Sequence, residues 1–307
     1  MPFEDELIGK TLKSSKGDYL LSSLHASGSR TFIYRAQDVK TKKTVAIKIL
    51  NPAIASTQTE KSRFHRSMSE SVNSKFFHKN ILRVYNAHIS TITWAVMEFI
   101  EGPSALALMY HAAAERMDWR DVWFIARDVA AALHHISSLG LVHRNVLPSN
   151  ILRRGMNADS LQAKHTWILS GLTLTKQASA IQVITAPGEL VGEMAFLPPE
   201  STYGAPSTTD IRSDMYGLGM TLYVLLSGDL PFADQSEEAV LRTIRSTDEF
   251  PDNIRTKQLT VRPEFADIVM KLIRKNPDSR FSSTAELLTS LEKVRKMKSK
   301  DFERYPE

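Results

Sequence analysis

A short polar loop and a single lysine are the residues of this sequence whose types and spacing could do chemistry. The loop lies in GLVHRNVLPSNIL, residues 140–152, and Lys48 ends the segment VAIK. The middle of the loop carries Asn145 and Leu147, and neither side chain is ionisable. An amide cannot act as a general base, and loss of such a base typically costs about 10²–10⁴-fold in rate. The residues therefore leave two alternatives, a working catalytic loop or the remains of one.

The first hundred residues of the chain must position Lys48, and their composition is typical of a β-sheet. Five segments are rich in β-branched and aromatic residues and are separated by polar or glycine-containing turns. These segments are residues 18–26, 31–39, 43–50, 81–90 and 93–100. Between them, Phe64, Met68, Val72 and Phe76 recur at helical spacing. The pattern predicts a small antiparallel β-sheet lobe with one main helix.

The remaining two hundred residues are dominated by helical patterns. Amphipathic or apolar helices are predicted over residues 119–140, 213–228, 262–277 and 283–297. Gly140 and Gly228 supply helix ends, and Ser283 or Thr284 supplies a helix start. The predicted class is α+β, with two lobes and a hinge near residues 97–102. The predicted ranges are an N-terminal extension at 1–18, a small lobe at 19–101, a larger, mostly helical lobe at 102–295 and a basic tail at 296–307.

Several motifs in order along the chain resemble those of serine/threonine protein kinases of bacterial style. The resemblance runs from about Tyr19 to Leu291. It is carried by VAIK, HKNILRVYNA, VMEFIEG, HRNVLPSNIL, GEMAFLPPE, SDMYGLGMTLYVLLSGDLPF and NPDSRFSS. It implies a two-lobed kinase fold in which Lys48 pairs with nucleotide phosphates.

Four positions depart from what the resemblance implies for catalysis. Asn145 stands at the catalytic base and Leu147 at the lysine that supports the transferred phosphate. Leu169 aligns with the aspartate that holds magnesium, and leucine offers no oxygen ligand. Glu193 replaces a threonine that contacts the base and the lysine. These coupled changes predict a kinase homologue without phosphotransfer activity and without a metal site.

The phosphate-binding elements of the family are also reduced here. The three glycines of its loop align with Ala26, Gly28 and Thr31, so one glycine remains to let the backbone approach phosphates. The helix glutamate that pairs with the family's lysine aligns with Ser69, one residue before Glu70. Glu70 either reaches Lys48 or is a solvated surface charge.

The resemblance implies an adenine slot that the sequence retains. Its apolar walls match Ile33, Ala46 and Leu152, and Met97 stands at the gatekeeper position. Its remaining contacts match backbone groups around Glu98 and Ile100, together with the side chains of Lys48 and Asn150. The alternative interpretation is that the apolar residues belong simply to the core.

The resemblance also implies contacts that hold the large lobe together. Glu200 and Arg280 match a buried ion pair, and Asp214 matches a residue that caps the backbone of the catalytic loop near His143 and Arg144. Loss of one partner of a buried pair costs about 3–5 kcal/mol. These residues therefore concern folding and not activity.

The composition excludes some classes of function. The chain has 307 residues, no cysteine and a net charge of +5. A thiolate nucleophile or a cysteine-based zinc site is therefore excluded, and the modest charge does not predict nucleic-acid binding. No segment approaches the roughly 18 apolar residues of a membrane helix, and the start lacks a signal peptide. A cytoplasmic protein is expected, although the basic run at 293–300 would also suit a stub before a membrane segment.

The sequence therefore predicts a binding or regulatory module that is not an enzyme. Its expected partner is a protein, either an active kinase or another signalling protein. ATP is the one cofactor candidate, bound weakly and without magnesium. The alternative prediction is an enzyme with residual or non-standard phosphoryl or nucleotidyl transfer, because kinase-like folds can bind nucleotide in other orientations.

Overall fold

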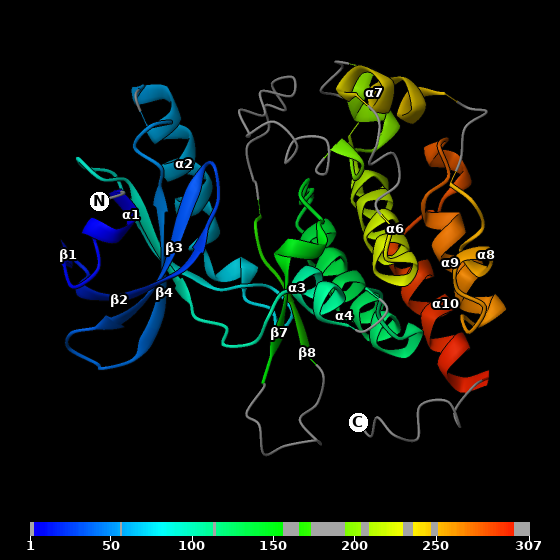
Figure 1. Cartoon of the computed structure of the whole chain (residues 1–307), viewed down its shortest axis with the longest axis horizontal. Coiled ribbons are helices and arrows are strands. Elements are labelled where there is room, and N and C mark those ends of the chain that lie inside the picture. The colour runs from blue at the N-terminus through cyan, green and yellow to red at the C-terminus, as the bar shows by residue number, and fades with distance from the viewer. Residues whose placement is uncertain are drawn as a thin grey trace.

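A computed structural model of the chain describes residues 3–55, 57–112, 115–155, 166–172, 194–203, 209–229, 236–246 and 251–297. Figure 1 shows a β-sheet lobe on the left and a helical lobe on the right, with strands β7 and β8 between them. The predicted two-lobed α+β kinase-like fold is confirmed.

The first lobe is built on one six-stranded antiparallel sheet with the order β1-β2-β3-β4-β6-β5. Its strands are β1 (Thr11–Ser14), β2 (Gly17–Ser27), β3 (Thr31–Asp38), β4 (Thr44–Leu50), β5 (Val84–His88) and β6 (Trp94–Glu98). The five predicted strands correspond to β2 to β6. β1 comes from the predicted N-terminal extension, so the boundary drawn at residue 18 falls inside the sheet.

Two α-helices and one short 3₁₀ turn accompany the sheet of this lobe. The short helix α1 (Phe3–Glu6) lies before β1, and helix α2 (Gln58–Ser71) lies between β4 and β5. Thr57 caps α2, since its side chain accepts a hydrogen bond from the backbone N–H of Glu60. The predicted helix ends earlier than its spacing suggested, because Phe76 lies in the separate 3₁₀ turn η1 (Ser74–Phe76).

The second lobe is mostly helical. Its elements are α3 (Ala105–His111), α4 (Trp119–Ser138), η2 (Pro148–Asn150), β7 (Ile151–Arg154), β8 (Thr166–Leu169), η3 (Pro199–Tyr203), α6 (Ile211–Ser227), α7 (Glu237–Arg245), α8 (Ile254–Lys257), α9 (Pro263–Leu272), η5 (Pro277–Ser279) and α10 (Thr284–Met297). All four predicted helices form, as α4, α6, α9 and α10. Helices α4 and α6 are buried along most of their length and form the centre of the core of this lobe.

The lobes are joined by the chain at residues 99–104 and by backbone contacts. At the chain crossing, the N–H of Arg153 donates to the carbonyl of Pro103 at 3.0 Å. A Cβ at Gly102 would lie 2.0 Å from the carbonyl oxygen of Arg153, so only glycine fits there. At a second point, the N–H of Leu82 donates to the carbonyl of Leu169 at 2.9 Å. These contacts hold the small β7–β8 sheet against the first lobe.

Candidate active site

The β-sheet of the first lobe separates its core from the predicted nucleotide slot. Successive strand residues point to opposite faces. On one face, residues of β3, β4 and β6 form the core of the lobe: Phe32, Tyr34, Ala36, Val45, Ile47, Ile49, Trp94 and Val96. On the other face, Ile33 pairs with Lys48, and Ala46 pairs with Met97. Ile33, Ala46 and Met97 pack in one small apolar cluster, so the predicted slot residues share a surface apart from that core.

Lys48 stands on the slot face of β4 and is partly buried. Its ammonium makes no salt bridge and no side-chain hydrogen bond with any residue in the described part of the chain. Burial lowers the pKa of Lys48, and the charge of Arg30 lowers it further. Glu70 is exposed and does not form the ion pair with Lys48 that the sequence left open. Within the described part of the chain, Lys48 is therefore a cation without a bonded carboxylate.

The hinge side of the slot offers unused backbone groups. Ile100 is buried, and neither its N–H nor its carbonyl has a hydrogen-bond partner among the described residues. The side chain of Glu98 forms a salt bridge with Arg154 of β7, which ties the hinge to the second lobe. Leu152 of β7 is partly buried and bridges to Ser104. The hinge thus has free backbone groups next to an apolar surface.

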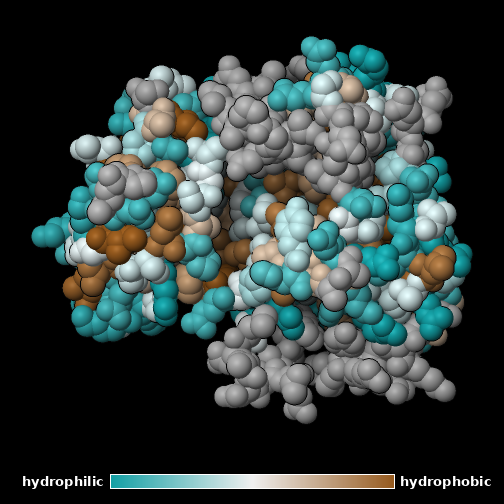
Figure 2. Space-filling view, viewed as in Figure 1, coloured by the Kyte–Doolittle hydropathy of each residue, from teal (hydrophilic) through white to brown (hydrophobic). Residues whose placement is uncertain are grey.

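Figure 2 shows that the molecule is hollowed between the two lobes on the face seen in this view, and hydrophobic residues are visible inside the hollow.

The turn at the sheet end of the slot is short, because the N–H of Gly28 donates to the carbonyl of Thr31 at 3.0 Å. A Cβ at Gly28 would meet nothing closer than 3.6 Å. The fold of this turn does not itself require a glycine.

Asp214 of α6 anchors the backbone of the predicted catalytic loop. Both carboxylate oxygens accept backbone N–H bonds at 2.6 Å, one from His143 and one from Arg144. Arg144 adopts a φ of 66°, an uncommon value for a residue with a side chain. Burial raises the pKa of Asp214 to about 7 against the opposing effect of these two bonds. Burial lowers the pKa of His143 to about 3, so its imidazole is neutral at physiological pH.

Asn145 and Asn150 of this loop contact Ser170 and Gly171, and the place where these four residues meet is called the top of the loop here. The amide of Asn145 donates to the carbonyl of Gly171 at 3.4 Å, and the amide of Asn150 donates to the carbonyl of Asn145 at 3.1 Å. The hydroxyl and the backbone N–H of Ser170 both donate to the carbonyl of Asn150, at 2.9 and 2.8 Å. Gly171 has a φ of 79°, and a Cβ there would lie 2.9 Å from the Asn150 side chain. None of the four residues carries a carboxylate.

Leu147 and Leu169 lie in the core and not at the top of the loop. Leu169 is 1% exposed and Leu147 is 9% exposed, and both belong to the hydrophobic core of the helical lobe. Ser170 and Gly171, directly after Leu169, are the residues that face the catalytic loop. The side chain of Leu169 therefore offers no ligand above the loop. Glu193 lies outside the described residues.

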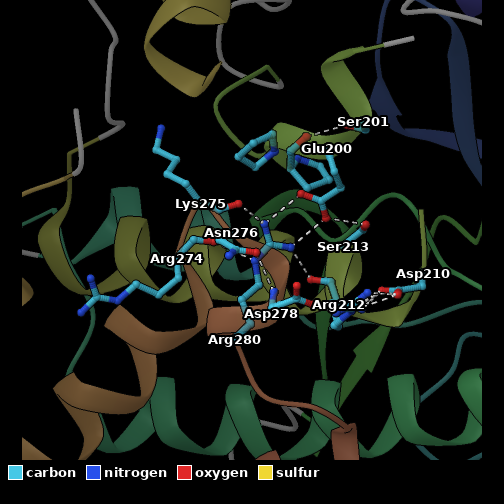
Figure 3. A network of polar contacts seen from close by, with 12 residues as sticks. Glu200, Ser201, Asp210, Arg212, Ser213, Arg274, Lys275, Asn276, Asp278 and Arg280 are labelled. Atoms are coloured by element: carbon cyan, nitrogen blue, oxygen red, sulfur yellow. Dashed lines mark hydrogen bonds and ion pairs between the residues drawn. The ribbon is translucent and has the colours of Figure 1, made fainter. Parts of the chain in front are cut away.

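A second polar network joins Glu200 to Arg280 and supports the large lobe (Figure 3). The Arg280 guanidinium binds both carboxylate oxygens of Glu200, at 2.7 and 2.9 Å. It also donates to the carbonyls of Arg212, Arg274 and Lys275, at 2.8, 2.8 and 3.1 Å. Burial alone would raise the pKa of Glu200, but Arg280 and Ser213 outweigh burial and hold that pKa below its ordinary value.

The described residues offer groups of the kinds that an adenine nucleotide needs. An apolar slot, free hinge groups and a cation without a bonded carboxylate are what an adenine ring and a phosphate chain require. Magnesium needs oxygen ligands, usually carboxylates, and the residues that meet above the loop supply only amide, hydroxyl and backbone groups. Within the described residues, no group of three or more histidines, aspartates or glutamates could hold a metal ion.

Two features were not found from the sequence. They are the charge of Arg30 near Lys48 and the side chain of Asn80, which donates to the carbonyl of Trp167 at 2.8 Å. The effects of Arg30 and Asn80 depend on contacts between distant segments and leave no local signal.

A sheet lobe, a helical lobe and an anchored loop between them define the class of two-lobed kinase folds. The family described as protein kinase domain matches residues 25–291, and the chain belongs to this family. In the described residues, no helix combines the length and the apolar character that crossing a membrane requires.

Similar proteins are bacterial serine/threonine-protein kinases. PknB of Mycolicibacterium smegmatis is 28% identical over 288 residues, covering 92% of this chain and 44% of that protein. A probable serine/threonine-protein kinase of Clostridium acetobutylicum is 25% identical over 301 residues, covering 97% of this chain and 43% of that protein. The chain thus spans less than half the length of these curated relatives.

A solved structure resembles the chain over nearly its whole length. The PknI kinase domain of Mycobacterium tuberculosis has a TM-score of 0.66 at 22% identity, covering 90% of this chain and 95% of that one. At this identity the likeness concerns the fold alone. Together with the family match, it confirms the bacterial-style kinase fold.

The prediction that this chain is not an enzyme is contradicted. It rested on the residue types at Asn145, Leu147, Leu169 and Glu193. The similar proteins are named serine/threonine-protein kinases and a kinase domain, and these names point to an enzyme. Residue types at four positions do not by themselves fix the activity of a site that retains Lys48, Asn150 and the apolar slot residues.

Proposed function

We propose that this chain is an ATP-dependent phosphotransferase that acts on serine or threonine hydroxyls of a protein, with chemistry that departs from the usual kinase pattern. The observation that carries the proposal is Lys48, an ammonium that bonds no carboxylate among the described residues and lies in register with Ile33 on the slot face. A desolvated cation without a counter-ion favours an anionic ligand. The names of the similar proteins support the same reaction class.

ATP, when bound, supplies the phosphoryl group, whose bond to the bridging oxygen breaks as its bond to the hydroxyl oxygen forms. Such transfer passes through a loose transition state, so positioning and charge neutralisation are the main tasks of the protein. In the proposed site, Ile33, Ala46 and Met97 hold the adenine, and backbone groups of Ile100 bind its edge. Lys48 neutralises charge on the phosphate chain.

Asn145 would orient the attacking hydroxyl. Its Nδ2 is used by the carbonyl of Gly171, which leaves Oδ1 to accept a hydrogen bond from the hydroxyl. An amide oxygen does not take up the proton, which passes to water as the new bond forms. The rate is therefore expected to lie about 10²–10⁴-fold below that of a site with a carboxylate base. We also propose that nucleotide binding does not need magnesium, since the described residues that meet above the loop, Asn145, Asn150, Ser170 and Gly171, carry no carboxylate.

Transfer of label from γ-labelled ATP to a mixture of unfolded proteins tests the proposal, with magnesium, with manganese and with EDTA. Slow incorporation on serine or threonine is expected, and Lys48→Ala should abolish it. Lys43→Ala is the matched control, because Lys43 is an exposed lysine just before the same strand. No incorporation by the wild-type chain, or equal incorporation by the Lys48→Ala variant, would refute the proposal.

A gain-of-function variant provides an independent check. Asn145→Asp places a carboxylate next to the expected position of the attacking hydroxyl. The rate of phosphoryl transfer should rise by about 10²-fold, which is the lower end of the range for a general base. Because Asn145 is partly exposed, the folded state should tolerate this change. An unchanged rate in a variant that melts like the wild type would show that Asn145 does not face the hydroxyl.

A further inference from the structure

The tip of the turn between β2 and β3 carries a fixed arginine. The side-chain amide of Asn51 donates to the carbonyl of Ser29 at 2.9 Å, and the backbone N–H of Asn51 donates to the carbonyl of Arg30 at 2.9 Å. The backbone of Arg30 is thereby held against the residue that follows β4. Asn51 is three residues after Lys48, which is about 10 Å along a strand.

The slot residues lie in a fixed order along β4. Ala46, paired with Met97, is at the hinge end, and Lys48 comes next on the same face. Arg30 is fixed beyond Lys48, at the end farthest from the hinge. A nucleotide whose adenine lies at Ala46 and whose first phosphates lie at Lys48 would direct its terminal phosphate toward Arg30.

The side chain of Arg30 is held by a contact that it can leave. Its guanidinium bonds Glu60 of α2 at 3.0 Å, and the Arg30 side chain is 38% exposed. Arg63 bonds the other carboxylate oxygen of Glu60 at 2.9 Å. Because Arg63 would stay, release of Arg30 does not leave Glu60 without a partner.

Positive charge exceeds negative charge at this end of the slot. Arg30, Arg63 and Lys48 are cations, and Glu60 is the carboxylate that bonds the two arginines. The charge of Arg30 reaches Lys48 and lowers the pKa of its ammonium. A polyanion that contacted both cations would remove this repulsion.

We propose that Arg30 binds the terminal phosphates of the nucleotide and supplies there the positive charge that a magnesium ion supplies in other phosphotransferases. The guanidinium exchanges Glu60 for phosphate oxygens, which it can engage through two parallel hydrogen bonds. The ligand class is a free polyphosphate, such as metal-free ATP. This inference rests on the proposed function, because it deepens the assignment of the same slot.

Titration calorimetry in EDTA tests the inference, with ATP, adenosine and inorganic tripolyphosphate as ligands. Arg30→Gln should weaken ATP and tripolyphosphate binding by about ten-fold or more, the usual effect of a lost charged hydrogen bond. Adenosine affinity should not change, because adenosine has no phosphate. Arg63→Gln is the matched control, since Arg63 bonds the same carboxylate from the helix side, and it should leave all three affinities unchanged. Thermal unfolding without ligand checks that both variants fold.

The outcomes separate this inference from the proposed function. If Arg30→Gln binds metal-free ATP as the wild type does, the role of Arg30 is refuted and the proposed function stands. If ATP binds only with magnesium, the role of Arg30 and the proposed metal-free binding are both refuted, whereas the proposed phosphotransfer reaction stands. Equal weakening by Arg63→Gln would refute it as well, since the effect would then be a general one of surface charge. If the wild type binds neither ATP nor adenosine, both proposals are wrong.

Discussion

The Arg280 guanidinium offers the sharpest test of how the large lobe is held together. Arginine has five N–H donors, and all five hydrogen bonds of this side chain are accounted for, two with Glu200 and three with backbone carbonyls. The Arg280 side chain is 0% exposed and that of Glu200 is 11% exposed, so water cannot replace a lost donor. The substitution Arg280→Lys keeps the positive charge and reduces the donors from five to three.

At least two of the five acceptors then lose their donor. A buried acceptor without a partner costs about 1–2 kcal/mol, so Arg280→Lys should lower the free energy of unfolding by about 2–4 kcal/mol. This is a large share of the roughly 5–15 kcal/mol that stabilises a folded domain. Urea unfolding followed by tryptophan fluorescence at neutral pH measures it. A loss below about 0.5 kcal/mol would refute the count of donors and acceptors.

Arg212→Lys is the matched control in the same network (Figure 3). Arg212 bonds Asp210 and Asp278 with a side chain that is 31% exposed, so its replacement should cost less than about 1 kcal/mol.

Glu200→Gln adds a test that varies the pH. Arg280 and Ser213 hold the pKa of Glu200 in the folded state below its ordinary value of 4.5. The contribution of Glu200 to the free energy of unfolding is therefore complete above pH 4.5 and is lost as the pH falls through the pKa of the folded state. The stability gap between wild type and Glu200→Gln should therefore narrow in acid.

Three further predictions concern single positions. Glu286→Gln should lower the melting temperature at neutral pH, because Glu286 accepts two bonds from Ser282 and has a pKa of about 2; the effect should fade as pH falls from 4.5 toward 2, and a loss that grows in acid would contradict it. Gly102→Ala should prevent normal folding or lower the melting temperature strongly, because its Cβ would overlap the carbonyl of Arg153; a variant that melts like the wild type would show that the crossing can widen. Gly28→Ala should change neither melting temperature nor ATP affinity, and a loss of ATP affinity alone would show that phosphate approaches this backbone.

The sequence was sufficient to predict most strands of the sheet and the four long helices. Strand composition and helical spacing identified β2 to β6 and the four long helices. The order of motifs placed Ile33, Ala46 and Met97 on one surface, and the register of the sheet brings them together. Such features follow from local patterns, which folding preserves.

The top of the catalytic loop could not be predicted, because strand register is not a local property. Shifting a strand by one residue turns every side chain to the opposite face. Ile151 pairs with Leu169, which places the leucine in the core and the following Ser170 above the loop. The motif alone aligned the metal position with the buried residue. The predicted absence of activity failed for a related reason, since residue types at single positions do not fix what the assembled site can do.

The contacts between the lobes have a mechanical consequence. Backbone hydrogen bonds join Pro103 to Arg153, Leu82 to Leu169 and Asn80 to Leu169. The salt bridge between Glu98 and Arg154 adds a side-chain link in the same region. A rotation that closes the slot without breaking these bonds should move the bonded residues little, while the tip of the β2–β3 turn, far from them, should move most.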